Sequence, residues 1–294
     1  MKVLLAEYAM FHDPFLASEG KAMLGVLTNS FTRCGYDVVI PDREDLAVEI
    51  SRLAPQSDIG LVIAPDHLLA RYTSILERHT RNLGCGAMSA AICAHKQKTG
   101  MILASHGIPV PEEMPKGLRV VKPVQGCGSK GVRLTRTLPR KGEFAQKYIE
   151  GDHLSVSVLA GRVVGEACLY YSGKPPIPLA INKQEIKIED GVFRYLGGET
   201  PLYPPREKEI IQTAIQVVQV LGCQGYIGVD VVVSDRVYVV DVNPRITTSL
   251  IGIAAIMEEE IADLLVRASQ GDIPPQVHHH CGVRFTKEGK VSRQ

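Results

Sequence analysis

The amino-acid sequence predicts a mixed fold, with an α/β domain first and α+β structure after it. In the first third of the chain, short apolar strands alternate with helices, which is typical of a parallel sheet. Later segments contain Val- and Tyr-rich runs separated by short polar turns, as in antiparallel hairpins. With 294 residues, 45% of them hydrophobic, the chain can bury a core sufficient for two or three small domains.

The composition argues against nucleic acid and membranes as partners. A formal net charge of +1 provides no basic footprint for nucleic acid or anionic lipid. No apolar run reaches the roughly 18 residues that a membrane span needs, and the first residues show no signal-peptide pattern. The seven cysteines are scattered and form no CxxC pair, so neither a disulfide framework nor a cysteine zinc site is indicated. We therefore expect a protein of a reducing, cytoplasmic compartment, with a chain long enough for an enzyme.

The N-terminal segment is expected to form a small parallel α/β domain. The apolar spacing predicts strands over residues 3–6, 36–40 and 58–64, and helices over residues 18–34 and 67–81. The strand ends of such a sheet face a crevice where ligands often bind. Glu7 follows the first strand and Glu19 opens the first helix, so both are candidates for contacting a substrate amine. An acid near a helix N-terminus is also an ordinary partner of the helix dipole.

A glycine-rich loop between two predicted strands is the main feature of the next segment. Residues 88–107 have helical spacing and include Lys96, and the following strand carries Lys122. Residues 126–131 then form a loop whose backbone N–H groups can fold over an anion. It is neither a P-loop nor a dinucleotide fingerprint, because GxxxxGK[ST] is absent and no helix follows. We interpret it as a lid over a nucleoside triphosphate, the alternative being a flexible hairpin tip.

A linker that mixes polar and apolar residues follows the lid. It leads into two further β runs, over residues 154–159 and 163–171. Tyr148 and Ile149 beside Gln146 and Lys147 could form an adenine slot in which backbone groups contact the base edge. His153, a few residues later, could reach a ribose hydroxyl. This segment by itself does not identify a nucleotide site.

Residues 225–245 predict a β-hairpin with a tight polar turn. If Asp235-Arg236 is a two-residue turn, Val233 pairs with Tyr238. Counting outward from that pair places Asp230 directly opposite Asp241. Directly opposed residues share one face of a sheet, so two carboxylates are expected to face the same space.

The hairpin is also a candidate metal site. Asn243 falls on the face that holds Asp230 and Asp241, so two carboxylates and an amide oxygen converge. Such a cluster repels itself unless a cation lies among the oxygens. Hard oxygen ligands suit Mg²⁺ or Mn²⁺, which usually share their coordination with substrate phosphates. The alternative is that Asp241 and Asn243 only cap the end of the strand.

The C-terminal region has helical spacing over residues 206–221 and 250–268. Near its end lie three adjacent histidines and a cysteine, His278, His279, His280 and Cys281. Consecutive residues of a strand alternate in direction and cannot all face one ion. We interpret these four residues as a surface cluster, and their role stays open.

The order of these segments along the chain is specific, although each segment alone is not. A lysine precedes a GIPVP element, a VVKP strand enters the Gly-Ser-Gly loop, and a QKYIEGDH linker precedes the VDVVVS…VVDVNPR hairpin. This set resembles the ATP-grasp superfamily of ATP-dependent carboxylate–amine ligases over essentially the whole chain. The resemblance implies an N-terminal α/β domain (1–87), a central lid domain (88–148) and a C-terminal antiparallel-sheet domain with the metal site (149–294), ATP lying between the last two.

The resemblance also implies roles for individual residues. Contacts with ATP are implied for Lys96, Lys122, Gly126, Gly128, Ser129, Gln146, Lys147, Ile149 and His153. One or two Mg²⁺ or Mn²⁺ ions are implied on Asp230, Asp241 and Asn243, and Arg245 matches the arginine beside the transferred phosphate. The chain departs from the family pattern where Gln146, His153 and Asp241 stand in place of frequent glutamates. The shorter Asp241 leaves the number of metal ions open.

The implied reaction is amide formation through an acyl phosphate. A carboxylate attacks the γ-phosphorus of ATP, and an amine then displaces phosphate. The EYAMFHD opening, the INKQEIKI strand and the LGGETP segment most resemble archaeal ligases that join the γ-carboxylate of L-glutamate to tyramine in methanofuran biosynthesis. This implies a catalytic role for Lys183 with Arg245, and substrate contacts for Asn182 and Thr247. Asn182 and Lys183 are equally interpreted as exposed strand residues.

Other functions stay open at this point. The ATP and metal residues do not distinguish this ligase from one that resembles D-alanine–D-alanine ligases or ligases acting on a protein C-terminal glutamate. A nucleotide-binding sensor without turnover would be expected to lack an acidic ligand, whereas Asp230 and Asp241 are both present. The expected partners are a small-molecule carboxylate and amine. Oligomeric state cannot be determined from the sequence, and the resemblance makes a homodimer one option.

Overall fold

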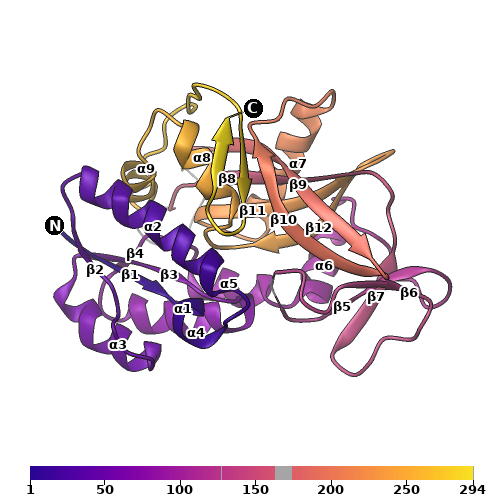
Figure 1. The fold of residues 1–294 in the computed structure, drawn as a ribbon, viewed down its shortest axis with the longest axis horizontal. Coiled ribbons are helices and arrows are strands. Elements are labelled where there is room, and N and C mark those ends of the chain that lie inside the picture. The colour runs from indigo at the N-terminus through magenta and orange to yellow at the C-terminus, as the bar shows by residue number, and fades with distance from the viewer. Residues whose placement is uncertain (127, 163–173, 294) are drawn as a thin grey trace.

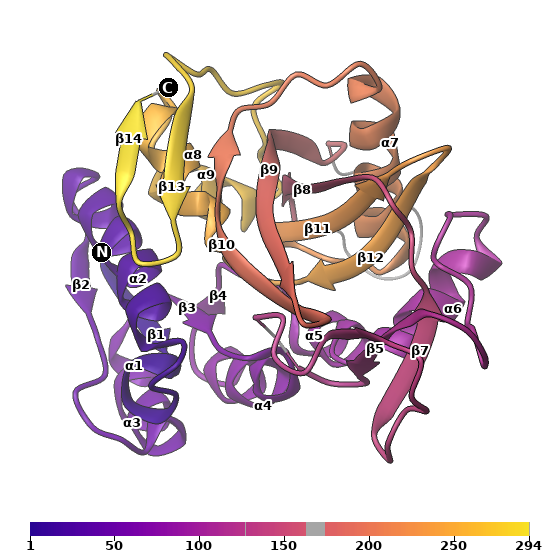
Figure 2. The same ribbon diagram turned by 45° about the vertical axis from the view of Figure 1, so that its right-hand side comes forward.

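The computed structural model describes residues 1–126, 128–162 and 174–293. These residues form two β-sheets with helices packed on them (Figures 1 and 2). One is a four-stranded sheet near the N-terminus, and the other is a ten-stranded sheet built from the rest of the chain. The predicted combination of α/β and α+β structure is therefore confirmed. The predicted β run over residues 163–171 lies outside the described residues.

The N-terminal sheet is parallel, as the alternation of strands and helices predicted. Its strand order is β2 (Asp37–Val39), β1 (Lys2–Glu7), β3 (Ile59–Ile63) and β4 (Arg81–Asn82). The helices that accompany it are α1 (Ala9–His12), α2 (Ala17–Arg33), α3 (Leu46–Leu53) and α4 (Asp66–Glu77), with a 3₁₀ turn over Ala54–Gln56.

Alternate residues of β1 pack against different helices. Val3 and Leu5 contact the apolar face of α2, whereas Leu4 and Ala6 pack with α3 and α4 on the opposite face. Helix α3 was not predicted, although Asp45 caps it by accepting hydrogen bonds from the backbone N–H groups of Ala47 and Val48, both at 3.1 Å. Two layers of helix thus hold the parallel sheet in place.

The larger sheet is antiparallel throughout its described pairings. Its strand order is β12-β11-β8-β9-β10-β6-β5-β7, with β13 on β10 and β14 on β13. The strands are β5 (Arg119–Pro123), β6 (Arg133–Thr135), β7 (Glu143–Lys147), β8 (Asp152–Ala160), β9 (Ile177–Glu189), β10 (Val192–Thr200), β11 (Gly225–Val233), β12 (Val237–Asn243), β13 (Val283–Thr286) and β14 (Val291–Arg293). In the described residues, β5–β7 join the remaining strands through one pair, Val192 with Arg133.

Helices α5 (Ala87–Cys93) and α6 (Lys96–Ser105) replace the single helix predicted over residues 88–107. The His95 side chain caps α6 by accepting a hydrogen bond from the backbone N–H of Lys98, at 3.3 Å. Lys96 is consequently the first residue of a helix, which fixes the direction of its side chain.

The C-terminal helices pack on the larger sheet. Helix α7 (Glu207–Val220) buries its apolar face against β8 and β9, as its spacing predicted. The second predicted helix, over residues 250–268, is divided into α8 (Ser249–Ile256) and α9 (Ile261–Ala268). Within the described residues, no helix combines the length and apolar character that crossing a bilayer requires. The domain boundaries at residues 88 and 149 stay a prediction. Strands from both sides of residue 149 belong to the same larger sheet.

Candidate active site

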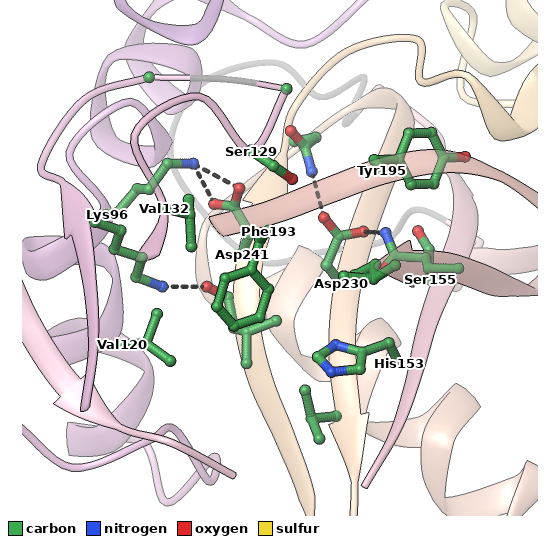
Figure 3. A pocket seen from close by; sticks show the side chains of 18 of the residues that line it. Lys96, Val120, Ser129, Val132, His153, Ser155, Phe193, Tyr195, Asp230 and Asp241 are labelled. Atoms are coloured by element: carbon green, nitrogen blue, oxygen red, sulfur yellow. Dashed lines mark hydrogen bonds and ion pairs between the residues drawn. The ribbon is translucent and has the colours of Figure 1, made fainter. Parts of the chain in front are cut away.

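A cavity lies between the lid strands β5–β7 and the antiparallel sheet formed by β8–β12 (Figure 3). It brings together most of the residues that the sequence predicted for a site. Its lining includes Glu19, Lys96, Lys122, Gly126, Gly128, Ser129, Gln146, Lys147, Ile149, His153, Asp230, Asp241, Asn243, Arg245 and Thr247. Residues more than 200 positions apart in the sequence therefore meet at one place.

The β11–β12 hairpin places Asp230 opposite Asp241, as predicted, but by a different register. Val233 pairs with Val237 rather than with Tyr238, because the turn contains Ser234 as well as the two predicted residues. A bulge between Asp230 and Val231 then shifts the register back. A regular strand would point Val240 and Asp241 to opposite faces, whereas both line the cavity here.

Asp230 is enclosed by hydrogen-bond donors. It accepts hydrogen bonds from Gln184 Nε2 at 3.0 Å and from Asn243 Nδ2 at 3.1 Å. Burial, together with the negative charge of Asp241, raises the pKa of Asp230 to about 6. A cation beside these two carboxylates would offset both effects.

Asp241 is held by Lys96 instead. Lys96 Nζ lies 2.5 Å from both of its carboxylate oxygens (Figure 3). Burial would raise the pKa of Asp241, but Lys96 and Lys122 lower it overall. The described residues contain no group of three His, Cys, Asp or Glu side chains placed to hold a metal ion. The donor set is thus two carboxylates with one amide, which fits a hard cation that keeps other oxygen ligands such as phosphates.

The two predicted phosphate lysines approach the hairpin from different elements. Lys96 comes from α6, and Asp66 lies 3.5 Å from its Nζ as a second carboxylate partner. Lys122 comes from β5 and donates to the backbone carbonyl of Val240 at 2.7 Å. Burial lowers the pKa of Lys122 to about 8. Burial alone would lower the pKa of Lys96, but the negative charges of Asp241 and Asp66 raise this pKa overall.

The lid and linker line the other side of the cavity. Gly128, Ser129 and Gly131 have φ angles of +62°, +58° and +79°, so the lid tip turns through left-handed backbone. Gln146 is buried and donates from Nε2 to the Pro111 carbonyl at 3.1 Å, which ties the linker to the segment before β5. Burial lowers the pKa of His153, so its ring is neutral at pH 7.

Three predicted substrate residues do not line the cavity. Glu7 is buried and accepts hydrogen bonds from the N–H groups of Ala9 (2.9 Å) and Met10 (2.8 Å), so it supports α1. Asn182 is buried and donates to the Ser155 carbonyl at 3.0 Å. Lys183 pairs with Leu154, a core residue on the face that α7 covers. The catalytic role of Lys183 and the substrate contacts of Glu7 and Asn182 stay predictions that this cavity lining does not support.

Several cavity residues were missed. Gln184 and Ile186 follow Asn182 at intervals of two, so strand alternation would have indicated them in place of Lys183. Phe193 and Tyr195 line the cavity from β10 by the same alternation. Asp66 could not be identified as a site residue from the sequence, because nothing in its local sequence links it to Lys96 or Arg245.

Tyr195, Glu19 and the start of α8 line one end of the cavity. Figure 3 shows Tyr195 on the far side of Asp230 from Lys96. Burial raises the pKa of Tyr195 well above its ordinary value, and its hydroxyl is hydrogen-bonded to Ser249. Thr248 Oγ1 donates to Glu19 Oε1. This end holds one carboxylate and three hydroxyl groups, which is suited to an ammonium or another polar substrate group.

The histidines near the C-terminus have carboxylate partners. His278 Nδ1 lies 2.8 Å from Glu259 Oε1, and His280 Nδ1 lies 3.4 Å from Glu258 Oε1. These contacts join the segment before β13 to the loop between α8 and α9. They lie away from the cavity residues.

Comparisons with known proteins agree with this geometry. A family model described as ATP-grasp domain matches residues 93–249. Tyramine–L-glutamate ligase of Methanocaldococcus fervens is 28% identical over 92% of this chain and 94% of its own length. D-Alanine–D-alanine ligase of Thermotoga petrophila is 27% identical over 81% of this chain and 88% of its own. The solved structure of an ATP-grasp superfamily protein from Archaeoglobus fulgidus has a TM-score of 0.77 and 27% identity, covering 97% of this chain and 92% of its own.

Proposed function

We propose a specific reaction from the premise that this chain belongs to the ATP-grasp family, whose model matches residues 93–249. The chain is an ATP-dependent carbon–nitrogen ligase that forms ADP. Our proposal is that it joins the γ-carboxylate of L-glutamate to the amine of tyramine, giving γ-glutamyltyramine, ADP and phosphate. ATP-grasp ligases in general use ATP and divalent metal ions, and we propose Mg²⁺ or Mn²⁺ on Asp230, Asp241 and Asn243.

The reaction proceeds in two steps. A carboxylate oxygen of the first substrate attacks the γ-phosphorus, ADP leaves, and an acyl phosphate forms. The amine nitrogen then attacks the acyl carbon, and phosphate leaves with the oxygen that came from the carboxylate. Because little covalent work falls to the protein, positioning and neutralisation of charge on the phosphate oxygens supply most of the catalysis.

One observation supports this chemistry most strongly. The facing carboxylates Asp230 and Asp241 lie in one cavity with three cations, Lys96, Lys122 and Arg245. We propose that the lysines and the arginine neutralise the phosphate oxygens, while a bound divalent cation supplies further positive charge. The lid glycines and Ser129 would cover the phosphates and exclude water from the acyl phosphate.

The choice of substrates rests on sequence similarity and on the end of the cavity near Tyr195. A relative named tyramine–L-glutamate ligase aligns with 92% of the chain. Glu19 is a carboxylate that could hold a substrate ammonium, and Thr247 is also part of the cavity lining. D-Alanine–D-alanine ligases also align with the chain, so a ligase for other amino acids is the second candidate.

The test is release of ADP and phosphate from ATP with Mg²⁺ across a panel of carboxylates and amines, with masses measured for the products. The panel contains L-glutamate with tyramine, and D-alanine alone. Turnover that requires both L-glutamate and tyramine, with a glutamyltyramine mass, supports the proposal. Turnover with another pair retains the ligase and discards these substrates. Nucleotide binding without any amide product would favour a sensor. The Asp241→Asn variant serves as the background control for contaminating ATPases.

A further inference from the structure

Asp66 is a buried carboxylate that contacts two cations of the cavity without lining the cavity itself. It is the first residue of α4, directly after β3, and is 1% exposed. Arg245 Nε donates to Asp66 Oδ1 at 3.0 Å, and Lys96 Nζ lies 3.5 Å from Asp66 Oδ2. Helix α4 thereby reaches the phosphate end of the proposed site through the side chain of Asp66.

Lys96 lies between two carboxylates of different kinds. Asp241 faces Asp230 in the hairpin, and its oxygens lie 2.5 Å from Lys96 Nζ. Asp66 belongs to helix α4, outside the hairpin. A cation at the hairpin would compete with Lys96 for the oxygens of Asp241, and a phosphate group would compete with Asp241 for Lys96. Asp66 Oδ2, which accepts no hydrogen bond from the described residues, is then the carboxylate oxygen that remains for Lys96.

We propose that Asp66 is a positioning residue that anchors Lys96 and Arg245 around the phosphates of the bound nucleotide. Since both cations contact one carboxylate fixed at the start of a helix, their placement is set by α4 rather than by two long, flexible side chains. The same carboxylate offsets the repulsion between the cations when no phosphate is present. The inference rests on the proposed function, because it takes Lys96 and Arg245 as phosphate contacts.

The test compares Asp66→Asn with Glu49→Gln. Asp66→Asn keeps the size of the side chain and removes its charge. Glu49 is a matched control, because it is also buried and paired with an arginine (Arg52, 2.7 Å) but lies on α3 outside the cavity. For each variant, the dissociation constant of MgADP is measured by calorimetry, kcat and KM for ATP by steady-state kinetics, and the thermal unfolding midpoint by circular dichroism.

We expect Asp66→Asn to weaken MgADP binding and to lower kcat/KM for ATP by about tenfold to a hundredfold, because a partner that orients a site residue is lost. Glu49→Gln is expected to lower the unfolding midpoint while MgADP affinity and the KM for ATP stay at wild-type values. Asp66→Glu keeps the charge but moves it by one methylene, so it should weaken MgADP binding by a smaller factor than Asp66→Asn.

A folded Asp66→Asn or Asp66→Glu variant with wild-type MgADP affinity and wild-type KM for ATP would overturn the proposal. So would equal losses of affinity in the Asp66 and Glu49 variants, since that result assigns Asp66 a purely structural role. The proposed ligase reaction is tested separately, and it is contradicted if the wild-type protein forms no amide with any substrate pair. The MgADP affinities still decide the role of Asp66 in that case.

Discussion

Asp230 and Asp241 lie opposite each other in one hairpin, yet their protonation differs because their partners differ. Asp230 is surrounded by amide and hydroxyl groups, and burial raises its pKa to about 6. Burial acts on Asp241 too, but Lys96 and Lys122 lower its pKa overall. The pair therefore presents one firmly ionised oxygen donor and one that ionises fully only near neutral pH or beside a cation.

The Asp241→Asn substitution is expected to reduce turnover by about 10² to 10³-fold, because it removes a charged ligand and the main partner of Lys96. The thermal unfolding midpoint should change little. Asp235→Asn, in the exposed turn of the same hairpin, is the matched control and should turn over like the wild type. Ligase rates in Asp241→Asn equal to those of Asp235→Asn would remove the metal assignment.

Single residues could be predicted from the sequence where strand alternation determines the face. Asp230, Asp241 and Asn243 were placed together this way, and Gln184 could have been. Lys183 was predicted from the family resemblance alone, and its pairing places it on the face of Leu154 rather than in the cavity lining. Asp66 could not have been predicted, since its partners Lys96 and Arg245 come from distant segments.

At the scale of elements, the β11–β12 bulge illustrates what a regular pattern cannot indicate. Counting residues from an assumed two-residue turn predicts that Val233 pairs with Tyr238. The longer turn shifts this register by one residue and the bulge shifts it back, so Asp230 and Asp241 still pair. The bulge has a consequence for the site, because the carbonyl of Val240 accepts from Lys122 while Asp241 accepts from Lys96. One strand thus contacts both of the lysines that we propose as phosphate ligands.

The lid loop contains a glycine, Gly131, at a left-handed position where a side chain would also be crowded. Gly131 has φ +79°, and an added Cβ would lie 3.1 Å from Pro123 Cγ. Gly131→Ala should therefore strain the lid by about 1 kcal/mol or more and raise the KM for ATP. Gly25→Ala, at an open position in α2, is the control that should leave the KM unchanged. An unchanged KM in Gly131→Ala would show that this turn does not shape the nucleotide site.

The ion pair between Arg133 and Glu143 links β6 to β7 across the lid strands. Glu143 accepts from both terminal nitrogens of Arg133, at 2.6 and 2.7 Å, and this bond lowers the pKa of Glu143 from 4.5 to about 2. A carboxyl whose pKa is lower in the folded state stabilises the fold above its unfolded pKa. That stabilisation, on the order of 2 kcal/mol, is lost as the pH falls from 4.5 toward 2.

Glu143→Gln should accordingly reduce the free energy of unfolding above pH 5, and its difference from the wild type should shrink as the pH approaches 2. Chemical denaturation at several pH values measures this difference. Glu44→Gln, which removes an exposed charge, is the control. A difference between Glu143→Gln and the wild type that does not depend on pH would contradict the assignment of the pair.

At the scale of the whole molecule, the parallel and antiparallel parts were predictable because their hydrophobic periods differ. The alternation of strands and helices in the N-terminal segment predicted the bounds of β1, α2, β2, β3 and α4 to within a few residues. The joining of lid and C-terminal strands into one sheet was not predictable, because it depends on a single pair between Val192 and Arg133. The cavity lies where that sheet, the lid and the N-terminal domain meet, so residues from all parts of the chain contribute to it.

The most direct measurement follows an oxygen atom. The carboxylate substrate that supports turnover, L-glutamate on our proposal, is labelled with ¹⁸O in its γ-carboxyl group and incubated with ATP, Mg²⁺ and the amine. If an acyl phosphate forms, its breakdown leaves one ¹⁸O in the released inorganic phosphate for each amide formed, and mass spectrometry detects it. Phosphate free of ¹⁸O, or label recovered in AMP, would contradict carboxylate activation by phosphoryl transfer and with it the central claim.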